Sequence, residues 1–174
     1  EGLGKSSLQG DIGFADVLHK MGADLVFGKD FLTIIGQESL QGIDVDLSSM
    51  PDVAQTLAVV ALFADGRTTI RGLHTLRVKE TDRLAALQNE LRKLGATVEI
   101  ENDDTLIIDP PEELKRAEID TYDDHRMAMS FALAGTRVHG VGIKNAQCVN
   151  KTEPEFFEDL KKITEISPKT DPAG

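Results

Sequence analysis

Two stretches of this 174-residue chain repeat one order of predicted elements at a distance of 73 residues. Residues 18–23 (LHKMGA) and 91–96 (LRKLGA) each end a helical pattern at a glycine, and each is followed by short strand-like runs. Repeats of about 20–50 residues are typical of solenoids. A period of 73 residues is too long for that architecture and predicts two related subdomains instead.

The repeat predicts a single α/β (α+β) domain over residues 1–166, built from two α-β-β-β-α-β units at about 10–77 and 78–165, with a further helix closing the second unit. A tail over 167–174, rich in Pro, Lys and Asp, is predicted to be disordered. Helices are expected at residues 11–21, 53–64, 78–94, 125–135 and 154–163. Strands are expected at residues 23–27, 31–35, 42–46, 67–73, 97–100, 105–108, 117–120 and 138–145.

Two of the expected helices have almost no polar face. Residues 53–64 and 125–135 are apolar nearly all round, and such a helix must be buried on every side. The sequence therefore predicts a core that contains these two helices. The last helix is amphipathic instead, and its inner stripe is expected to hold Phe156, Phe157, Leu160 and Ile163.

Charge and cysteine content limit the possible partners. The net charge of −11 argues against a nucleic acid or an anionic membrane, and no apolar run approaches the roughly 18 residues that span a bilayer. A local cluster of Lys and Arg can still bind a small anion at short range. The single cysteine, Cys148, excludes an internal disulfide and a metal site built on cysteine pairs, which fits a reducing cytoplasm. No metal and no cofactor are expected.

The hexamer Val78–Arg83 (VKETDR) is predicted to open a helix directly after a strand. Unpaired backbone N–H groups and the helix dipole favour anions at such a start. Lys79 and Arg83 would lie four residues apart on one face beside Glu80, an arrangement that suits anion binding and proton transfer. The simpler interpretation is a solvated first turn with intrahelical salt bridges.

The repeat places other charged residues at equivalent helix starts. Shifting Lys79 by 72 positions reaches Lys151, and shifting Asp52 by 73 positions reaches His125. If the two units are related by rotation about a common axis, these helix starts converge at one end of the domain and form one site. The alternative is that each residue only caps its own helix, as Asp52 could. The candidate site residues are Asp52, Lys79, Glu80, Arg83, His125, Arg126 and Lys151.

Three motifs carry a family resemblance, namely SMPD at 49–52, LRVKETDR at 76–83 and YDDHRMAM at 122–129. They resemble the motifs of the EPSP synthase family, the 3-phosphoshikimate 1-carboxyvinyltransferases. The resemblance covers positions 1 to about 165, and since members are much longer, the chain resembles only their C-terminal part. It implies one domain of an inside-out fold of repeated units, with parallel helices inside and sheets facing solvent. Further matching runs are QGD at 9–11, FADVL at 14–18 and CVNKT at 148–152.

The resemblance also implies a reaction. The enolpyruvyl group of phosphoenolpyruvate is transferred to the 5-hydroxyl of shikimate 3-phosphate and phosphate is released, in the shikimate pathway to chorismate and the aromatic amino acids. Such an addition and elimination needs a proton acceptor, a proton donor and cations that hold the phosphates and the carboxylate.

Matched residue by residue, the family implies a role for each candidate. Asp52 is implied as proton acceptor and shikimate contact, Glu80 as proton donor, and His125 beside this catalytic pair as a supporting hydrogen-bond partner. The implied shikimate 3-phosphate site contains Lys79 and Thr75 in addition to Asp52. The implied phosphoenolpyruvate site contains Arg83, Arg126 and Lys151.

The chain departs from the family pattern at two positions. Thr75 stands where some members have an asparagine that binds shikimate 3-phosphate, and Glu153 stands where many have phenylalanine, which adds negative charge near Lys151. The residues that the family's N-terminal domain supplies have no counterpart in this sequence. We therefore expect the isolated chain to be inactive or nearly so, and to need that domain as its partner.

Two other interpretations remain open. One is a catalytically silent module that binds phosphate or phosphoenolpyruvate. The other is part of a UDP-N-acetylglucosamine enolpyruvyl transferase, although KETDR at 79–83 and DDHR at 123–126 resemble the shikimate branch more closely. The catalytic cysteine of that relative lies in a part that this chain lacks, and Cys148 does not replace it by position. Core or supporting positions are expected for Tyr122, Met127, Met129 and Cys148.

Overall fold

The computed structural model describes residues 3–4 and 7–166, so the tail predicted at 167–174 lies outside the described residues. None of the described helices is both long and apolar enough to cross a membrane.

The first half contains the 3-10 helices η1 (Gly10–Gly13) and η2 (Pro51–Val53), the helices α1 (Phe14–Lys20) and α2 (Ala54–Ala61), and the strands β1 (Asp24–Phe27), β2 (Leu32–Ile35), β3 (Leu40–Gln41), β4 (Asp44–Asp46), β5 (Ala64–Asp65) and β6 (Thr68–Arg71). The second half contains η3 (His74–Val78), α3 (Arg83–Lys93), β7 (Thr97–Glu101), β8 (Thr105–Asp109), β9 (Glu118–Ile119), α4 (His125–Gly135), β10 (Gly142–Ile143), η4 (Ala146–Lys151) and α5 (Phe156–Ile166).

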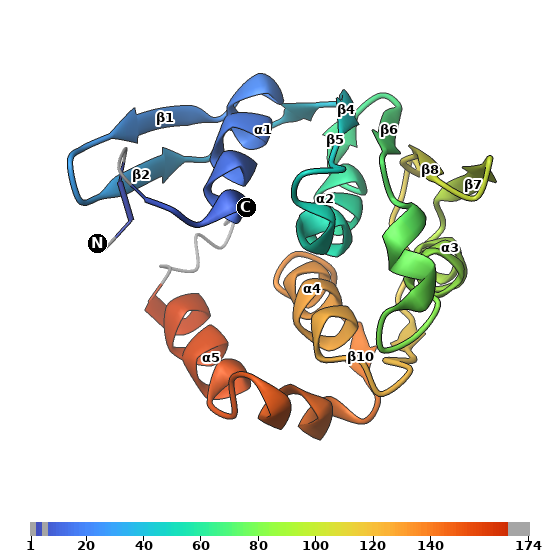
Figure 1. Cartoon of the computed structure of the whole chain (residues 1–174). Coiled ribbons are helices and arrows are strands. Elements are labelled where there is room, and N and C mark those ends of the chain that lie inside the picture. The colour runs from blue at the N-terminus through green and yellow to red at the C-terminus, as the bar shows by residue number, and fades with distance from the viewer. Residues whose placement is uncertain (1–2, 5–6, 167–174) are drawn as a thin grey trace, which may run out of the picture.

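Helices α2, α3 and α4 form the centre of the molecule. Helix α2 packs against both α3 and α4, and Figure 1 shows α2 and α4 nearly end-on, with the strands outside them. Most residues of α2 and α4 are buried, including Leu57 and Phe131. Across the contact between the two helices, Thr56 Oγ1 lies 3.2 Å from Ser130 Oγ. The prediction that the two apolar helices lie in the core is confirmed.

Strands from both predicted units join one four-stranded sheet in the order β4-β6-β8-β7. Strand β4 runs parallel to β6, whereas β8 is antiparallel to both β6 and β7. Along β7, Val98 is buried and Ile100 is half-buried, whereas Thr97, Glu99 and Glu101 are exposed. This alternation shows that one face of β7 covers the core and the other meets solvent, as the inside-out fold requires.

The order of elements recurs along the chain. Helix α1 is followed by the antiparallel hairpin β1–β2, and α3 by the antiparallel hairpin β7–β8. Helix α2 connects the parallel pair β4–β6, and α4 connects the parallel pair β9–β10. Likewise η3 leads into α3, and η4 leads into α5. The unit boundaries at 10–77 and 78–165 stay predictions.

The two hairpins differ in their surroundings. Strand β8 lies between β7 and β6 and is almost entirely buried. Strand β2 pairs only with β1 among the described residues, and Val26, Ile34 and Ile35 of this hairpin are exposed. The first hairpin therefore has exposed apolar side chains and, within residues 3–4 and 7–166, an edge without a strand partner.

The hexamer Val78–Arg83 does not open a helix, contrary to the prediction. Val78 is the last residue of η3, and α3 begins only at Arg83. The physical reason is Asp82, whose carboxylate accepts a hydrogen bond from the backbone N–H of Ala85 at 3.1 Å and so caps the helix. The residues between η3 and Asp82 form a connecting loop, so no common helical face aligns their side chains with that of Arg83.

Two further predictions were wrong in extent. The strand expected at 138–145 is reduced to β10, because Val138 N donates to Ala134 O at 2.8 Å and prolongs the end of α4. The chain then turns at Gly140, where φ is +86°. In α5, Ile163 is 67% exposed and does not belong to a buried stripe.

Candidate active site

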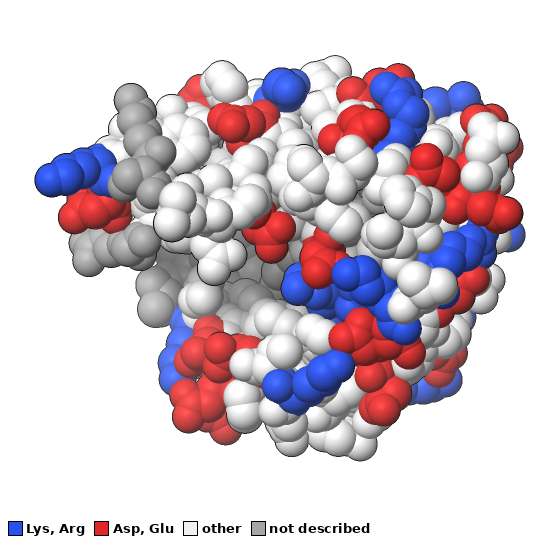
Figure 2. All heavy atoms as spheres, viewed as in Figure 1, with Lys and Arg blue, Asp and Glu red and all other residues white. Residues whose placement is uncertain are grey.

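Seven charged side chains, called the charged cluster below, meet around the starts of helices α2, α3 and α4. Four are cations and three are carboxylates, so the cluster has a small positive excess on a chain of net charge −11. Figure 2 shows basic and acidic side chains in contact with one another on this face of the molecule, over the region of these helices. The members are Asp52, Lys79, Glu80, Arg83, Asp124, Arg126 and Lys151.

The cluster residues come from four different segments. Asp52 lies in η2 just before α2, Arg83 is the first residue of α3, and Arg126 is the second residue of α4. Lys151 is the last residue of η4 and does not begin α5, contrary to the prediction. The N-cap of α2 is Val53, so the alternative that Asp52 caps its helix is also wrong.

Asp52 is surrounded by three cations. Its carboxylate lies 3.0 Å from Arg83 Nη1, 3.3 Å from Lys79 Nζ and 3.5 Å from Arg126 Nη2. Partial burial alone would raise the pKa of Asp52, but the charges of Arg126, Lys79 and Arg83 outweigh burial and hold this pKa below its ordinary value. Asp52 is therefore ionised at neutral pH.

Arg83 is the centre of the cluster and is almost completely buried. Its Nε donates to Asp124 Oδ2 at 2.7 Å, its Nη1 donates to Asp52 at 3.0 Å, and its Nη2 donates to Glu80 Oε2 at 2.8 Å. A guanidinium group presents its donors in a rigid fork, which suits several carboxylates at once. The three acidic residues thus fix the orientation of Arg83.

Glu80 joins Arg83 to the more exposed Lys151. Lys151 Nζ donates to Glu80 Oε1 at 2.9 Å, although the two residues lie 71 positions apart. This hydrogen bond is the main reason why the pKa of Glu80 falls from its ordinary 4.5 to about 2. In this state Glu80 holds no proton at neutral pH.

His125 lies beside the cluster without joining it through a hydrogen bond. Its side chain is buried, its Nδ1 has no hydrogen-bond partner among the described residues, and burial lowers its pKa. A small cavity of about 290 Å³ is lined by His125, Arg126, Met129, Thr152 and Glu153. Glu153 therefore adds an acidic side chain to the wall of this cavity.

Thr75 is not drawn into the cluster by any hydrogen bond. It lies in η3, and its Oγ1 is buried without a partner among the described residues. Its predicted contact with a substrate stays a prediction.

Sequence reasoning gave no role to Asp124, which the structure places against the buried guanidinium of Arg83. Asp124 caps α4 by accepting a hydrogen bond from Arg126 N at 2.8 Å, and it binds Arg83 at the same time. A signal existed, because an acidic residue directly before an apolar helix is a typical N-cap. The pairing with Arg83 could not be predicted, since it joins residues 41 positions apart.

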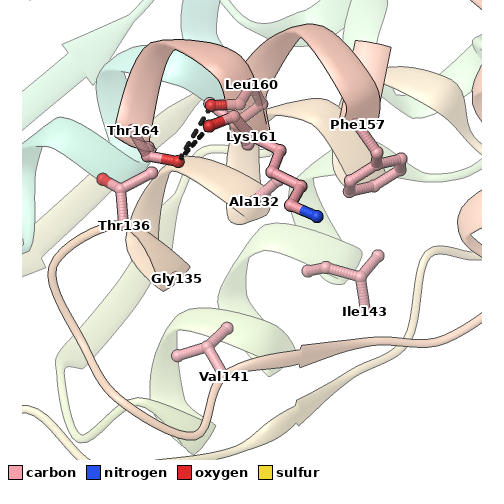
Figure 3. A pocket seen from close by; sticks show the side chains of 9 residues that line it. All are labelled: Ala132, Gly135, Thr136, Val141, Ile143, Phe157, Leu160, Lys161 and Thr164. Atoms are coloured by element: carbon pink, nitrogen blue, oxygen red, sulfur yellow. Dashed lines mark hydrogen bonds between the residues drawn. The ribbon is translucent and has the colours of Figure 1, made fainter. Parts of the chain in front are cut away.

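Another cavity lies away from the cluster. It has a volume of about 390 Å³ and lies between α5, α4 and β10 (Figure 3), where Phe157 and Lys161 of α5 face Val141 and Ile143. Its lining is mostly apolar and contains no cluster residue. The cavity therefore does not replace the cluster as the candidate site.

Comparison with known proteins gives the family. Residues 1–160 match the family described as EPSP synthase (3-phosphoshikimate 1-carboxyvinyltransferase). The chain is 55% identical over 171 residues to the chloroplastic 3-phosphoshikimate 1-carboxyvinyltransferase of Solanum lycopersicum, which covers 94% of the chain and 33% of that protein. It is also 50% identical over 167 residues to the 3-phosphoshikimate 1-carboxyvinyltransferase of Vibrio vulnificus. This alignment covers 95% of the chain and 38% of the relative.

A solved structure of EPSP synthase from Acinetobacter baumannii aligns with a TM-score of 0.75 at 29% identity, over 86% of this chain and 38% of that one. The enolpyruvyl transferase NikO from Streptomyces tendae shares the fold at 23% identity, with a TM-score of 0.66 over 87% of this chain and 34% of that one. The chain thus spans between a third and two fifths of the length of these proteins. It belongs to the EPSP synthase family, whose members are named 3-phosphoshikimate 1-carboxyvinyltransferase.

Proposed function

We propose that this chain forms one wall of an active site that transfers the enolpyruvyl group of phosphoenolpyruvate to the 5-hydroxyl of shikimate 3-phosphate and releases phosphate. The observation that carries the proposal is the convergence of four cations and three carboxylates, from segments far apart in the sequence, at one end of the helical core. Membership of the family supports it independently.

The cations suit the two anionic substrates. Arg83, Arg126 and Lys151 would hold phosphoenolpyruvate, since guanidinium and ammonium groups bind phosphate and carboxylate through charge-assisted hydrogen bonds. Lys79, together with Asp52 and Thr75, would contact shikimate 3-phosphate. Asp52 pairs with Lys79 and Arg83, and Glu80 pairs with Lys151. Substrate anions would therefore compete with the protein's own carboxylates.

Asp52 and Glu80 would divide the proton transfers. Asp52 is ionised and can accept the proton of the attacking hydroxyl. Glu80 must be protonated to serve as proton donor. While Lys151 binds it, its pKa is about 2, so at neutral pH it carries no proton to donate. If phosphoenolpyruvate takes over the hydrogen bonds of Lys151, the main cause of the low pKa is removed. Substrate binding would thereby prepare Glu80 for protonation, with buried His125 as a neighbouring support.

The proposal includes a second domain of the same enzyme as partner. The relatives are about three times as long as the matched stretch, and an enclosed site needs a wall opposite the charged cluster. Without it, the chain would bind phosphoenolpyruvate weakly and show little or no turnover. A binding role without chemistry is the second candidate function, and the short span of the chain relative to its relatives favours it for the chain alone. We also propose a cytoplasmic location, whereas the plant relatives are named chloroplastic.

Titration of the 174-residue chain with phosphoenolpyruvate and shikimate 3-phosphate, followed by NMR of backbone amides, tests the proposal. We expect the amide signals of Arg83, Arg126 and Lys151 to shift together with phosphoenolpyruvate. An Arg126→Ala variant should weaken the binding of phosphoenolpyruvate. The control is Arg67→Ala, which removes an exposed arginine paired with Asp109 and should leave this binding unchanged. If the cluster signals stay unchanged with both substrates, the proposed function is wrong for this chain. Robust phosphate release by the chain alone would contradict its expected inactivity.

A further inference from the structure

The turn that carries Asp124 has an unusual backbone. Tyr122 and Asp123 both adopt left-handed conformations, with φ of +54° and +57°. Such values are uncommon for residues other than glycine and persist where the surroundings hold them. Asp124 follows directly, and its N–H donates to Thr121 O at 2.9 Å. The position of the Asp124 carboxylate on Arg83 thus depends on what holds this turn.

Glu90 holds the turn through two hydrogen bonds. It lies on α3 at a position where the helix faces the core, and its side chain is 0% exposed. One carboxylate oxygen accepts from Tyr122 Oη at 2.8 Å, and the other accepts from Asp120 N at 3.0 Å and from Lys93 Nζ at 2.6 Å. Every buried oxygen of Glu90 is therefore matched by a donor, and two of the three donors belong to the segment that leads into Asp124.

Neighbouring contacts extend this connection to η4. Asn145 Nδ2 donates to Asp123 Oδ1 at 2.9 Å, and Lys144 Nζ donates to Asp120 Oδ1 at 3.0 Å. Asn145 immediately precedes η4, the element that ends at Lys151. The turn at Tyr122–Asp123 is therefore hydrogen-bonded to α3 and to the residue before η4, and it runs directly into α4. These three elements carry the cations assigned to phosphoenolpyruvate.

We propose that Glu90 is a positioning residue for the anion site: through Tyr122 and the left-handed turn, it holds Asp124 against Arg83 and so sets the orientation of the Arg83 guanidinium. Glu90 does not touch the cluster itself, and no substrate would touch Glu90. Its effect on substrate binding rests on the proposed function, whereas its effect on Arg83 does not.

A purely structural role makes a different prediction. A buried carboxylate is expensive to desolvate, and an apolar residue among the buried leucines of α3 would often stabilise a helix more. If Glu90 served only stability, its replacement would change the free energy of unfolding and leave Arg83 as it is. The two roles are therefore separated by observing Arg83 directly.

The Nε–Hε signal of Arg83 in NMR is a suitable reporter. This group is buried and donates to Asp124, so we expect a resolved signal that exchanges slowly with water. In Glu90→Gln one acceptor oxygen becomes an NH₂ group, so whichever way the amide turns, either Tyr122 or the pair Lys93 and Asp120 loses its acceptor. The Arg83 signal should shift and its exchange should quicken, and Tyr122→Phe should produce a smaller change in the same direction. Glu112→Gln, at an exposed glutamate, is the matched control and should leave the signal unchanged.

Titration with phosphoenolpyruvate adds the functional arm. We expect Glu90→Gln and Tyr122→Phe to raise the Kd by about threefold to tenfold, and the double variant to exceed the larger single effect only slightly. An unchanged Arg83 signal in Glu90→Gln would overturn the proposal, even if the variant were less stable. If Glu90→Gln fails to fold, Tyr122→Phe alone decides, since it removes only one hydroxyl. If the unaltered chain shows no binding of phosphoenolpyruvate, the proposed function fails while the Arg83 signal still tests the positioning role.

Discussion

Arg83 and Asp124 meet in the interior, with the Nε of Arg83 2.7 Å from Oδ2 of Asp124 and the two side chains 1% and 0% exposed. A buried ion pair of this kind stabilises little relative to an apolar pair, but loss of one partner leaves an uncompensated charge. Arg83 is the first residue of α3 and Asp124 is the N-cap of α4, so a change in either residue affects the starts of both helices.

Replacement of Asp124 by alanine should be strongly destabilising. Arg83 would keep only Asp52 and Glu80 as partners, and α4 would lose its cap. We expect the free energy of unfolding to fall by about 3–5 kcal/mol, measured by urea denaturation. Asp109→Ala, which breaks the exposed pair with Arg67, serves as control and should lower the free energy of unfolding far less. Equal effects of the two substitutions would contradict this prediction.

The low pKa of Glu80 predicts a specific dependence of stability on pH. Because the pKa in the folded state is about 2 and the ordinary value is 4.5, the carboxylate stabilises the fold fully above pH 4.5. This contribution is lost as the pH falls from 4.5 towards 2. Urea denaturation across that window should therefore give a shallower pH dependence for Glu80→Gln than for the unaltered chain.

Lys151 offers an independent check on the cause of that pKa. In Lys151→Ala the carboxylate of Glu80 loses its main hydrogen bond, so its pKa should move up towards 4.5. Carbon-13 NMR of the glutamate side-chain carboxyl groups measures this directly. Lys162→Ala, which removes a lysine paired with Asp159 on α5, should leave the Glu80 titration unchanged. A Glu80 pKa that stays near 2 without Lys151 would refute the assigned cause.

Lys79 and Lys151 should discriminate between the two substrates. Lys151→Ala should weaken the binding of phosphoenolpyruvate by about 1.5–3 kcal/mol, the range for a hydrogen bond to a charged group. It should have little effect on the binding of shikimate 3-phosphate. Lys79→Ala should do the reverse. Isothermal titration calorimetry with each substrate measures both, and identical effects of the two variants on both substrates would argue against separate subsites.

The exposed hairpin β1–β2 predicts self-association of the chain in isolation. In the described part of the chain, the edge of β2 has no strand partner, and Ile34 and Ile35 are exposed. Such features favour strand addition between molecules. Sedimentation velocity should show a mass that rises with concentration, and Ile34→Lys should reduce that rise. Ile163→Lys on α5, another exposed apolar position, is the control. A mass independent of concentration would refute the prediction.

The sequence was most informative where one local pattern determines the structure. Helix α4 was predicted at residues 125–135 and is observed at those bounds, because its apolar residues pack on α2 and Asp124 caps it. The stop of α3 before Gly95 was equally clear, since Gly95 has φ of +104°. In both cases the signal lies within a few residues.

Predictions failed where a neighbouring contact competes with the pattern. The charges of VKETDR predict a helix start at Val78, but the carboxylate that caps α3 is that of Asp82. A glutamate on a helix is normally solvated, and the residues around Glu90 do not indicate its hydrogen bond with Tyr122. The only local signal for its burial is its place among the buried leucines of α3.

The contact between α2 and α4 also fixes a distance within the charged cluster. Thr56 Oγ1 lies 3.2 Å from Ser130 Oγ along this contact, and Asp52 lies 3.5 Å from Arg126 Nη2 at its end. Both pairs join α2 and the turn before it to α4. A shift of α4 along α2 would therefore change both distances at once, and a substitution in the helix contact could alter the cluster without touching a charged residue.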